Sequence, residues 1–174
     1  AWDERQLAAL PAEVRARYKF HFDEPRDDEV RWDLDVLAYI DARVRTWRGR
    51  IDGVFSSSDY PGVIAAAAIA EALGLPGSPP ESVLLAAHKY YARLAQRAVV
   101  PEAVPRFALL DPADEQTWPA EGAFPCFVKP VKGSFSLFAR RIQDRAALRA
   151  FTSAPALAEF RAYYVRLFDE LSAR

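Results

Sequence analysis

The sequence predicts an α/β protein in which helices pack on a parallel sheet, followed by a small α+β lobe with an antiparallel hairpin. Helical and strand-like segments alternate with short links before residue 80, as in parallel sheets covered by helices. After residue 124, two apolar segments flank a short loop that contains glycine and serine, which is typical of a hairpin. We therefore expect two domains, at residues 1–85 and 86–174.

The composition indicates a soluble globular protein. Hydrophobic residues make up 51% of the 174 residues and charged residues 27%, which allows a sizeable core without disulfides or metals. The single cysteine, Cys126, excludes a disulfide framework and a cysteine-rich zinc site. No apolar segment approaches the ~20 residues of a membrane-spanning helix, and no signal peptide opens the chain, so we expect a cytoplasmic protein.

The first half of the chain alternates between helical and strand-like patterns. Apolar residues recur at helical spacing in three segments, which predicts helices at residues 3–16, 33–48 and 61–73. Short apolar or alternating segments between them predict strands at residues 18–22 and 51–55. These two strands would form the parallel sheet, with the second and third helices flanking it.

The second half predicts further helices around the hairpin. In chain order we expect a helical segment, a strand, the two hairpin strands and two final helices, at residues 80–100, 106–110, 124–130, 136–142, 144–152 and 155–172. The first of these segments is one helix or two helices broken near His88, because the pattern allows both.

Small polar residues gather where the strand at 51–55 would end and the next helix would begin. In open α/β sheets ligands bind at such places, because the free N–H groups of a helix start bind anions or carboxylates. Ser57, Ser58 and Asp59 are therefore candidate contacts for a substrate or a nucleotide. Capping of the helix by Ser58 or Asp59 explains the same residues without a ligand. The two roles are compatible.

The first hairpin strand ends in a lysine, Lys129, and Lys132, Gly133, Ser134 and Ser136 follow in the loop. A flexible backbone beside a lysine suits the binding of phosphate groups. The pattern differs from a P-loop, in which the lysine follows the glycines and opens a helix. The lysines also lie in basic stretches, since residues 89–110 carry a net charge of +3 and residues 129–174 one of +5. Solvation of helix faces by arginine is the ordinary alternative.

Upstream of the hairpin, Lys89 opens a helix that leads through a proline-rich link, residues 100–105, to a strand. Together these features resemble the front half of the ATP-grasp nucleotide-binding fold, over roughly residues 51–151. The resemblance implies that Lys89 and Lys129 contact the phosphates of ATP and that the loop closes over them. It also implies that the first domain is preATP-grasp-like and that the second is the first lobe of the fold.

The resemblance implies a ligase that joins a carboxylate to an amine or a thiol through an acyl phosphate. It further implies that magnesium is held by a second lobe, so we expect this chain to be an incomplete N-terminal portion that is inactive alone. A non-catalytic α/β binding or scaffold module is the alternative, and an unrelated α/β domain is a third interpretation. The expected partners are a nucleotide and a small carboxylate, and neither a nucleic acid nor a membrane is expected.

Overall fold

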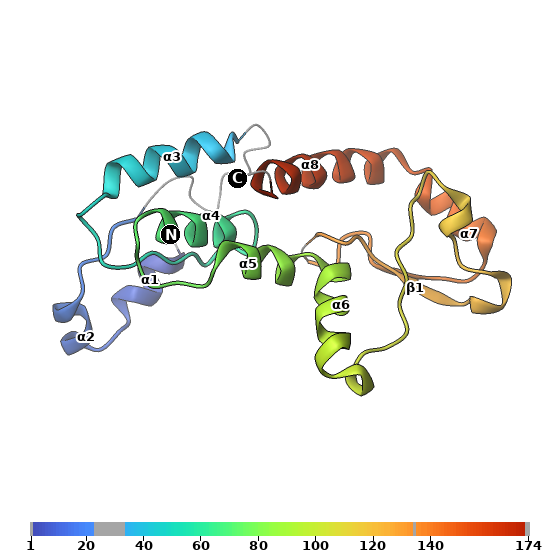
Figure 1. Ribbon diagram of the computed structural model, residues 1–174, viewed down its shortest axis with the longest axis horizontal. Helices are drawn as coiled ribbons and strands as arrows, with labels where there is room; N and C mark the ends of the chain where they lie inside the picture. Colours follow the sequence, from blue (N-terminus) through green and yellow to red (C-terminus); the bar gives the residue numbers. More distant parts are fainter. Residues whose placement is uncertain (1, 23–33, 134, 173–174) are drawn as a thin grey trace.

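A computed structural model describes residues 2–22, 34–133 and 135–172 (Figure 1). The described residues are mostly helical, and their sheet consists of two short antiparallel strands, β1 (Cys126–Val128) and β2 (Arg140–Ile142). The predicted parallel-sheet α/β fold is therefore wrong. The segments expected as strands at 18–22, 51–55 and 106–110 are irregular in the structure.

These three segments lack the neighbours that a strand needs. Tyr18 is 55% exposed and Phe55 is 71% exposed, so the apolar pattern that predicted strands does not mark a buried sheet face. Val54 does pack against a hydrophobic core, which shows that this segment covers helices instead of pairing with another strand. An extended link between helices and a short strand have the same local sequence pattern.

The first four helices are α1 (Trp2–Ala8), α2 (Ala12–Arg17), α3 (Val36–Trp47) and α4 (Gly62–Ala72). The helix expected at 3–16 is divided, because α1 ends at Ala8 and Pro11 precedes α2 as its N-cap residue. The helices expected at 33–48 and 61–73 are confirmed as α3 and α4. Asp35 caps α3, since its Oδ1 accepts a hydrogen bond of 2.9 Å from the Ala38 N–H.

Helix α4 lies between α3 and α5 (Pro80–Ala87) and is buried over most of its surface. Its alanines allow this close packing, and residues 64–70 are all buried. Gly74 lies just beyond the end of the helix, and its φ of +68° is accessible to glycine at little cost. The Leu75 N–H then donates a 2.8 Å hydrogen bond to the Ala70 carbonyl, which completes a Schellman motif.

The segment at 80–100 contains two helices with a break at His88, which is one of the two alternatives that the sequence pattern allows. Helix α5 ends at Ala87 and α6 (Lys89–Val99) turns away from it, as Figure 1 shows. His88 adopts an extended conformation, and its Nδ1 accepts a 3.3 Å hydrogen bond from the Tyr91 N–H. The histidine therefore caps α6 and fixes the position of Lys89, the first residue of that helix.

The rest of the chain contains the hairpin and two helices. Three short 3₁₀ helices, η1 (Pro101–Ala103), η2 (Glu115–Thr117) and η3 (Glu121–Ala123), precede β1. The antiparallel hairpin is confirmed, with Phe127 opposite Arg141. Helices α7 (Arg145–Thr152) and α8 (Pro155–Ser172) match the two final helices that the sequence predicts.

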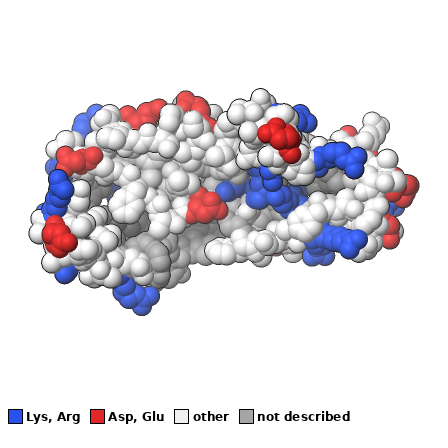
Figure 2. Space-filling view, turned by 90° about the horizontal axis from the view of Figure 1, so that it is seen from below, with Lys and Arg blue, Asp and Glu red and all other residues white. Residues whose placement is uncertain are grey.

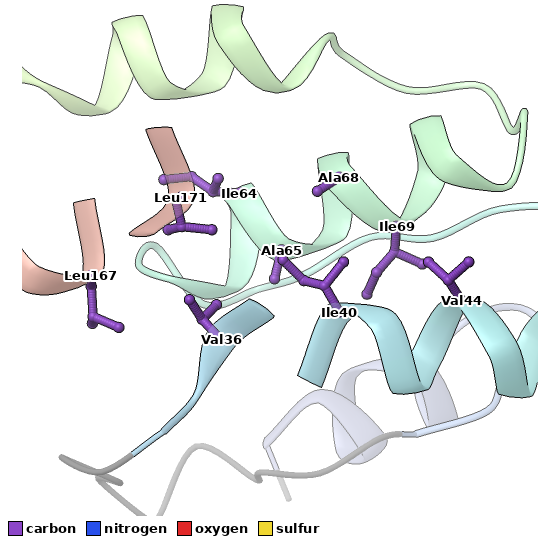
Figure 3. Packing of buried hydrophobic residues seen from close by; sticks show 9 residues of the cluster. All are labelled: Val36, Ile40, Val44, Ile64, Ala65, Ala68, Ile69, Leu167 and Leu171. Atoms are coloured by element: carbon purple, nitrogen blue, oxygen red, sulfur yellow. The ribbon is translucent and has the colours of Figure 1, made fainter. Parts of the chain in front are cut away.

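Two hydrophobic cores are present among the described residues. The first core is formed by α3, α4 and the end of α8, and comprises Val36, Ile40, Val44, Ile64, Ala65, Ala68, Ile69, Leu167 and Leu171 (Figure 3). The second core comprises Trp118, Ile142, Leu148, Phe151 and Leu157. Helix α8 contributes to both cores, and Figure 1 shows it running from α7 to the region of α3 and α4. It therefore connects the two parts of the molecule.

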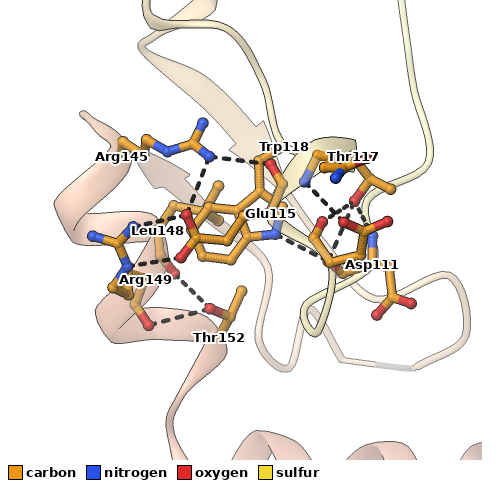
Figure 4. A network of polar contacts seen from close by, with 10 residues as sticks. Asp111, Glu115, Thr117, Trp118, Arg145, Leu148, Arg149 and Thr152 are labelled. Carbon is orange, nitrogen blue, oxygen red and sulfur yellow. Dashed lines mark hydrogen bonds and ion pairs between the residues drawn. The ribbon is translucent and has the colours of Figure 1, made fainter.

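A polar network holds the loop at residues 111–123 against α7 (Figure 4). The Trp118 Nε1–H donates a 2.9 Å hydrogen bond to the Asp111 carbonyl. Glu115 accepts hydrogen bonds from Arg149, at 2.8 and 2.9 Å, and from Arg145, at 3.2 Å. The hydrogen bonds from Arg149, and then from Arg145, lower the pKa of Glu115. This network is structural, because its charged groups are already bonded to one another.

Within the described residues, no helix has the length and apolar character needed to cross a membrane.

Candidate anion-binding site

Three lysines gather beside the hairpin loop. The chain has four lysines and nineteen arginines, so most of the lysines lie at this one place. Lys89 begins α6, Lys129 follows β1, and Lys132 lies three residues farther along the loop. We call Lys89, Lys129 and Lys132 the lysine cluster. In Figure 2, Lys and Arg side chains gather around the middle of the face shown, with an acidic side chain next to them.

Lys89 is attached to the loop through two hydrogen bonds. Its backbone N–H donates to the Val131 carbonyl at 2.8 Å, which satisfies a donor that a helix start leaves unpaired. Its Nζ donates to the Gly133 carbonyl, also at 2.8 Å. An ammonium group has three N–H donors, so this contact leaves Lys89 able to bind a ligand oxygen as well.

Lys132 is buried, with a relative exposure of 6%. Its Nζ lies 3.6 Å from Oδ1 of Asp59 and 4.4 Å from the centre of the Tyr60 ring. A carboxylate and an aromatic face both stabilise a desolvated ammonium group. The contact brings the segment between α3 and α4 against the hairpin loop, although the two are far apart in the sequence.

The charges of the cluster affect one another. Burial lowers the pKa of Lys89, and the ammonium groups of Lys132 and Lys129 lower it further, while Asp59 opposes the shift. Burial also lowers the pKa of Lys132, and Asp59 again opposes it. Like charges held close together favour the approach of an anion, because the anion relieves their repulsion.

A pocket of about 220 Å³ opens beside Lys89 and Lys129. Gly133 and Ser136 contribute further polar groups, and Phe127 and Leu137 form apolar walls, with the last of these 50% exposed. Three residues of the loop have positive φ without being glycine: Phe135, Ser136 and Phe138, at 55°, 57° and 55°. Such a conformation is uncommon for residues with a side chain, and it makes the loop a tight turn around the pocket.

Gly133 fits this turn for two reasons. Its φ of +155° is unfavourable for a residue with a side chain, and a Cβ atom there would lie 2.8 Å from Cζ of Phe160. The ring of Phe160 packs in turn against Phe138, with 5.0 Å between ring centres. Helix α8 therefore supports the loop from the side of Phe160.

The structure brings most of the predicted phosphate-binding residues together. Lys89, Lys129, Gly133 and Ser136 line the pocket, and Lys132 lies next to them at the same loop. Ser134 lies outside the described residues. No local signal in the sequence marks Lys132 as buried, although it is 6% exposed in the structure.

Of the predicted substrate contacts Ser57, Ser58 and Asp59, it is Asp59 that has an ion pair with the lysine cluster. Asp59 reaches the cluster through its ion pair with Lys132, a contact between segments that are far apart in the sequence. Neither Ser58 nor Asp59 caps α4 through its side chain, because the N-cap is Pro61 and has no side-chain hydrogen bond. Instead the Ser58 carbonyl accepts a 3.0 Å hydrogen bond from the Val63 N–H. Ser57 is exposed in the same turn.

A second and larger hollow, of about 380 Å³, lies between β2 and α7. Arg140 and Arg141 line it, but Arg140 already stacks on the ring of Phe151 at 4.9 Å. Both arginines are exposed, whereas Lys89 and Lys132 of the cluster are at least partly desolvated. The lysine cluster is therefore the stronger candidate for binding an anion.

Among the described residues, no group of three or more His, Cys, Asp or Glu side chains is arranged to hold a metal ion. Comparison of the chain with protein family models, with curated proteins and with solved structures gave no match.

Proposed function

We propose that the lysine cluster binds the phosphate groups of a nucleotide, as the resemblance to ATP-grasp proteins implies. The observation that carries this proposal is the convergence of Lys89, Lys129 and Lys132 from two separate segments onto one loop. The electrostatic repulsion between partly buried ammonium groups is relieved by an anion. The hairpin, on which the resemblance mainly rests, is present at the expected residues.

The pocket suits a phosphate chain better than a whole nucleotide. Its volume of about 220 Å³ is below the roughly 300–1,000 Å³ that is typical of pockets enclosing an entire small ligand. Lys89 and Lys129 lie on the pocket wall and would bind phosphate oxygens as point charges. Ser136 would add a hydroxyl donor from the loop.

The proposed reaction is the ATP-dependent activation of a carboxylate. A carboxylate oxygen of the substrate attacks the terminal phosphorus of ATP, and the bond from that phosphorus to ADP breaks. An amine or thiol then attacks the acyl carbon and loses a proton to solvent, and the bond to phosphate breaks so that phosphate leaves. The segment at 57–59 was the expected substrate contact, and the pairing of Asp59 with Lys132 supports its location near the phosphate site.

Magnesium normally neutralises the charge that develops in such a transfer. The described residues do not offer a suitable group of ligands, so the proposal assigns the metal to other side chains, as the family resemblance implies. The lysines contribute binding and orientation of the phosphates. A cytoplasmic location, where ATP is abundant, belongs to the same proposal.

Titration of the protein with ATP in a calorimeter tests the proposal. We expect a dissociation constant on the order of millimolar, and about tenfold weaker binding for Lys89→Ala and for Lys129→Ala, as for the loss of one charge-assisted hydrogen bond. Lys19→Ala is the matched control, because Lys19 is the chain's other lysine and is exposed. Affinity should also fall with added salt.

Adenosine provides a second control, because it lacks phosphates. Its binding should be the same in the wild-type protein and in the two lysine variants. ATP binding that is equal in Lys89→Ala, Lys129→Ala and Lys19→Ala would contradict the proposal. ATP binding without turnover agrees with the proposal, because the family resemblance assigns the magnesium ligands to a second lobe.

A further inference from the structure

Asp59 is the carboxylate that faces the lysine cluster. Its Oδ1 lies 3.6 Å from Nζ of Lys132, and its charge acts on Lys89 as well. Within the described part of the chain, no other acidic group is among the charges that shift the pKa of these two lysines. Asp59 therefore already occupies the electrostatic position that a bound anion would take.

The two partners of this ion pair differ in their exposure. The side chain of Lys132 is 6% exposed, whereas that of Asp59 is 65% exposed. A buried ammonium group needs an anionic partner, because its desolvation is otherwise uncompensated. The Asp59 carboxylate is largely solvated by water, so the ion pair stabilises it less than it stabilises the buried ammonium group. The ion pair therefore matters more to Lys132 than to Asp59.

The backbone around Asp59 is connected to two helices. The preceding residue, Ser58, accepts a hydrogen bond from the Val63 N–H at the start of α4. The following residue, Tyr60, places its ring against Lys132 and stacks on Tyr164 of α8, with 5.5 Å between ring centres. A change in the partner of Lys132 would therefore act on the segment at residues 56–60.

We propose that Asp59 is an internal counter-anion that a phosphate group displaces, so that the segment at 56–60 restrains ligand binding and is released by it. This inference rests on the proposed function, and it adds the regulation of the same site. In the absence of ligand the Asp59 carboxylate stabilises the cluster. A phosphate carries more negative charge than a carboxylate and offers more acceptor oxygens, so it can replace Asp59 at the lysines.

The first test compares Asp59→Asn with Asp52→Asn in titrations with ATP and with inorganic pyrophosphate. Asp52 is an exposed carboxylate in the same connecting segment, and its charge is not among those that shift the lysine pKa values. We expect about fivefold tighter binding for Asp59→Asn, as for the removal of one competing charge at about 4 Å in a water-like environment. Asp52→Asn should bind as the wild type does. Far-ultraviolet circular dichroism confirms that each variant is folded.

A double variant tests whether the tighter ATP binding of Asp59→Asn depends on Lys132. In Lys132→Ala the ammonium group that pairs with Asp59 is absent, so adding Asp59→Asn should tighten ATP binding by clearly less than fivefold.

The second test needs no variant. It measures hydrogen–deuterium exchange of the wild type with and without saturating pyrophosphate. Peptides that cover residues 56–60 should exchange faster with ligand, while those from the middle of α4 should not change.

The outcomes separate this inference from the proposed function. If Lys89→Ala and Lys129→Ala weaken ATP binding but Asp59→Asn does not tighten it relative to Asp52→Asn, the inference is wrong and the proposed site stands. Unchanged exchange at 56–60 in the ligand-saturated protein overturns the release of the segment. If neither lysine variant alters ATP binding, the proposed function fails, and the inference fails with it.

Discussion

At Lys89, burial and two neighbouring ammonium groups act in the same direction. Both lower the pKa of Lys89 below its ordinary value of 10.5. Protonated Lys89 attracts phosphate and the neutral amine does not, so ATP affinity should fall as the pH rises through this lowered pKa. The phosphates of ATP are ionised throughout this range, because their last pKa lies near 6 to 7.

We therefore expect the dissociation constant for ATP to rise at alkaline pH values that are still below 10.5. Calorimetric titrations over a series of buffers measure this dependence. In Lys89→Ala the rise should be smaller, because the titrating group is absent, although Lys132 still contributes. An affinity that is the same at neutral pH and just below 10.5 would show that Lys89 does not hold the ligand.

The residues of the candidate site could be predicted in part. Lys129, Gly133 and Ser136 are close in the sequence, so a local pattern was enough to connect them. Lys89 was connected to them only by the family resemblance. The contact between Lys132 and Asp59 could not be predicted, because it depends on how the segment before α4 approaches the hairpin loop. Burial of a lysine leaves no local sequence signal.

At the scale of elements, helices were more predictable than strands. Helices α3, α4, α7 and α8 lie close to their expected bounds, because helical periodicity and capping are local properties. The predicted strands at 18–22 and 51–55 are absent, because a strand forms only where a distant segment pairs with it. The hairpin was predictable since its two strands are joined by a short loop.

The turn between the hairpin strands predicts a specific effect of Gly133→Ala. The added Cβ would contact the Phe160 ring at 2.8 Å, and the φ of +155° is unfavourable for alanine. We expect a loss of about 1–3 kcal/mol in the free energy of unfolding, measured in urea. Gly53→Ala is the control, because a Cβ at Gly53 meets nothing within 4 Å.

Phe160→Leu removes the ring that causes the clash. In the Phe160→Leu background, Gly133→Ala should therefore cost less than it does in the wild type, leaving mainly the backbone strain. An equal cost in both backgrounds would show that the α8 contact does not constrain the turn.

At the scale of the whole molecule, α8 is the element that joins the two cores. Leu167 and Leu171 lie in the first core and Leu157 lies in the second. An alternation of helices with short extended links is shared by parallel-sheet proteins and by this helical arrangement, so the sequence pattern could not separate them. The difference depends on whether the extended segments pair with one another.

The shared helix predicts that both cores unfold together. Leu171→Ala should destabilise the protein by about 2–5 kcal/mol, as a large-to-small change at a residue that is 5% exposed. The fluorescence of Trp118, which lies in the second core, should report the same lowered midpoint as circular dichroism does. For this measurement the other three tryptophans are replaced by phenylalanine.

Val165→Ala, at a position of α8 that is 51% exposed, should change the midpoint only slightly. A Trp118 transition that stays at the wild-type midpoint in Leu171→Ala would show that the two cores unfold separately.

The placement of the lysines also makes the candidate site chemically distinct from the rest of the surface. Acylating reagents and cyanate modify primary amines and leave the guanidinium groups of the nineteen arginines unchanged. Lys129 is exposed and Lys89 is half-buried, so mild carbamylation would remove charge from this cluster, whereas the buried Lys132 and the nineteen arginines would stay charged.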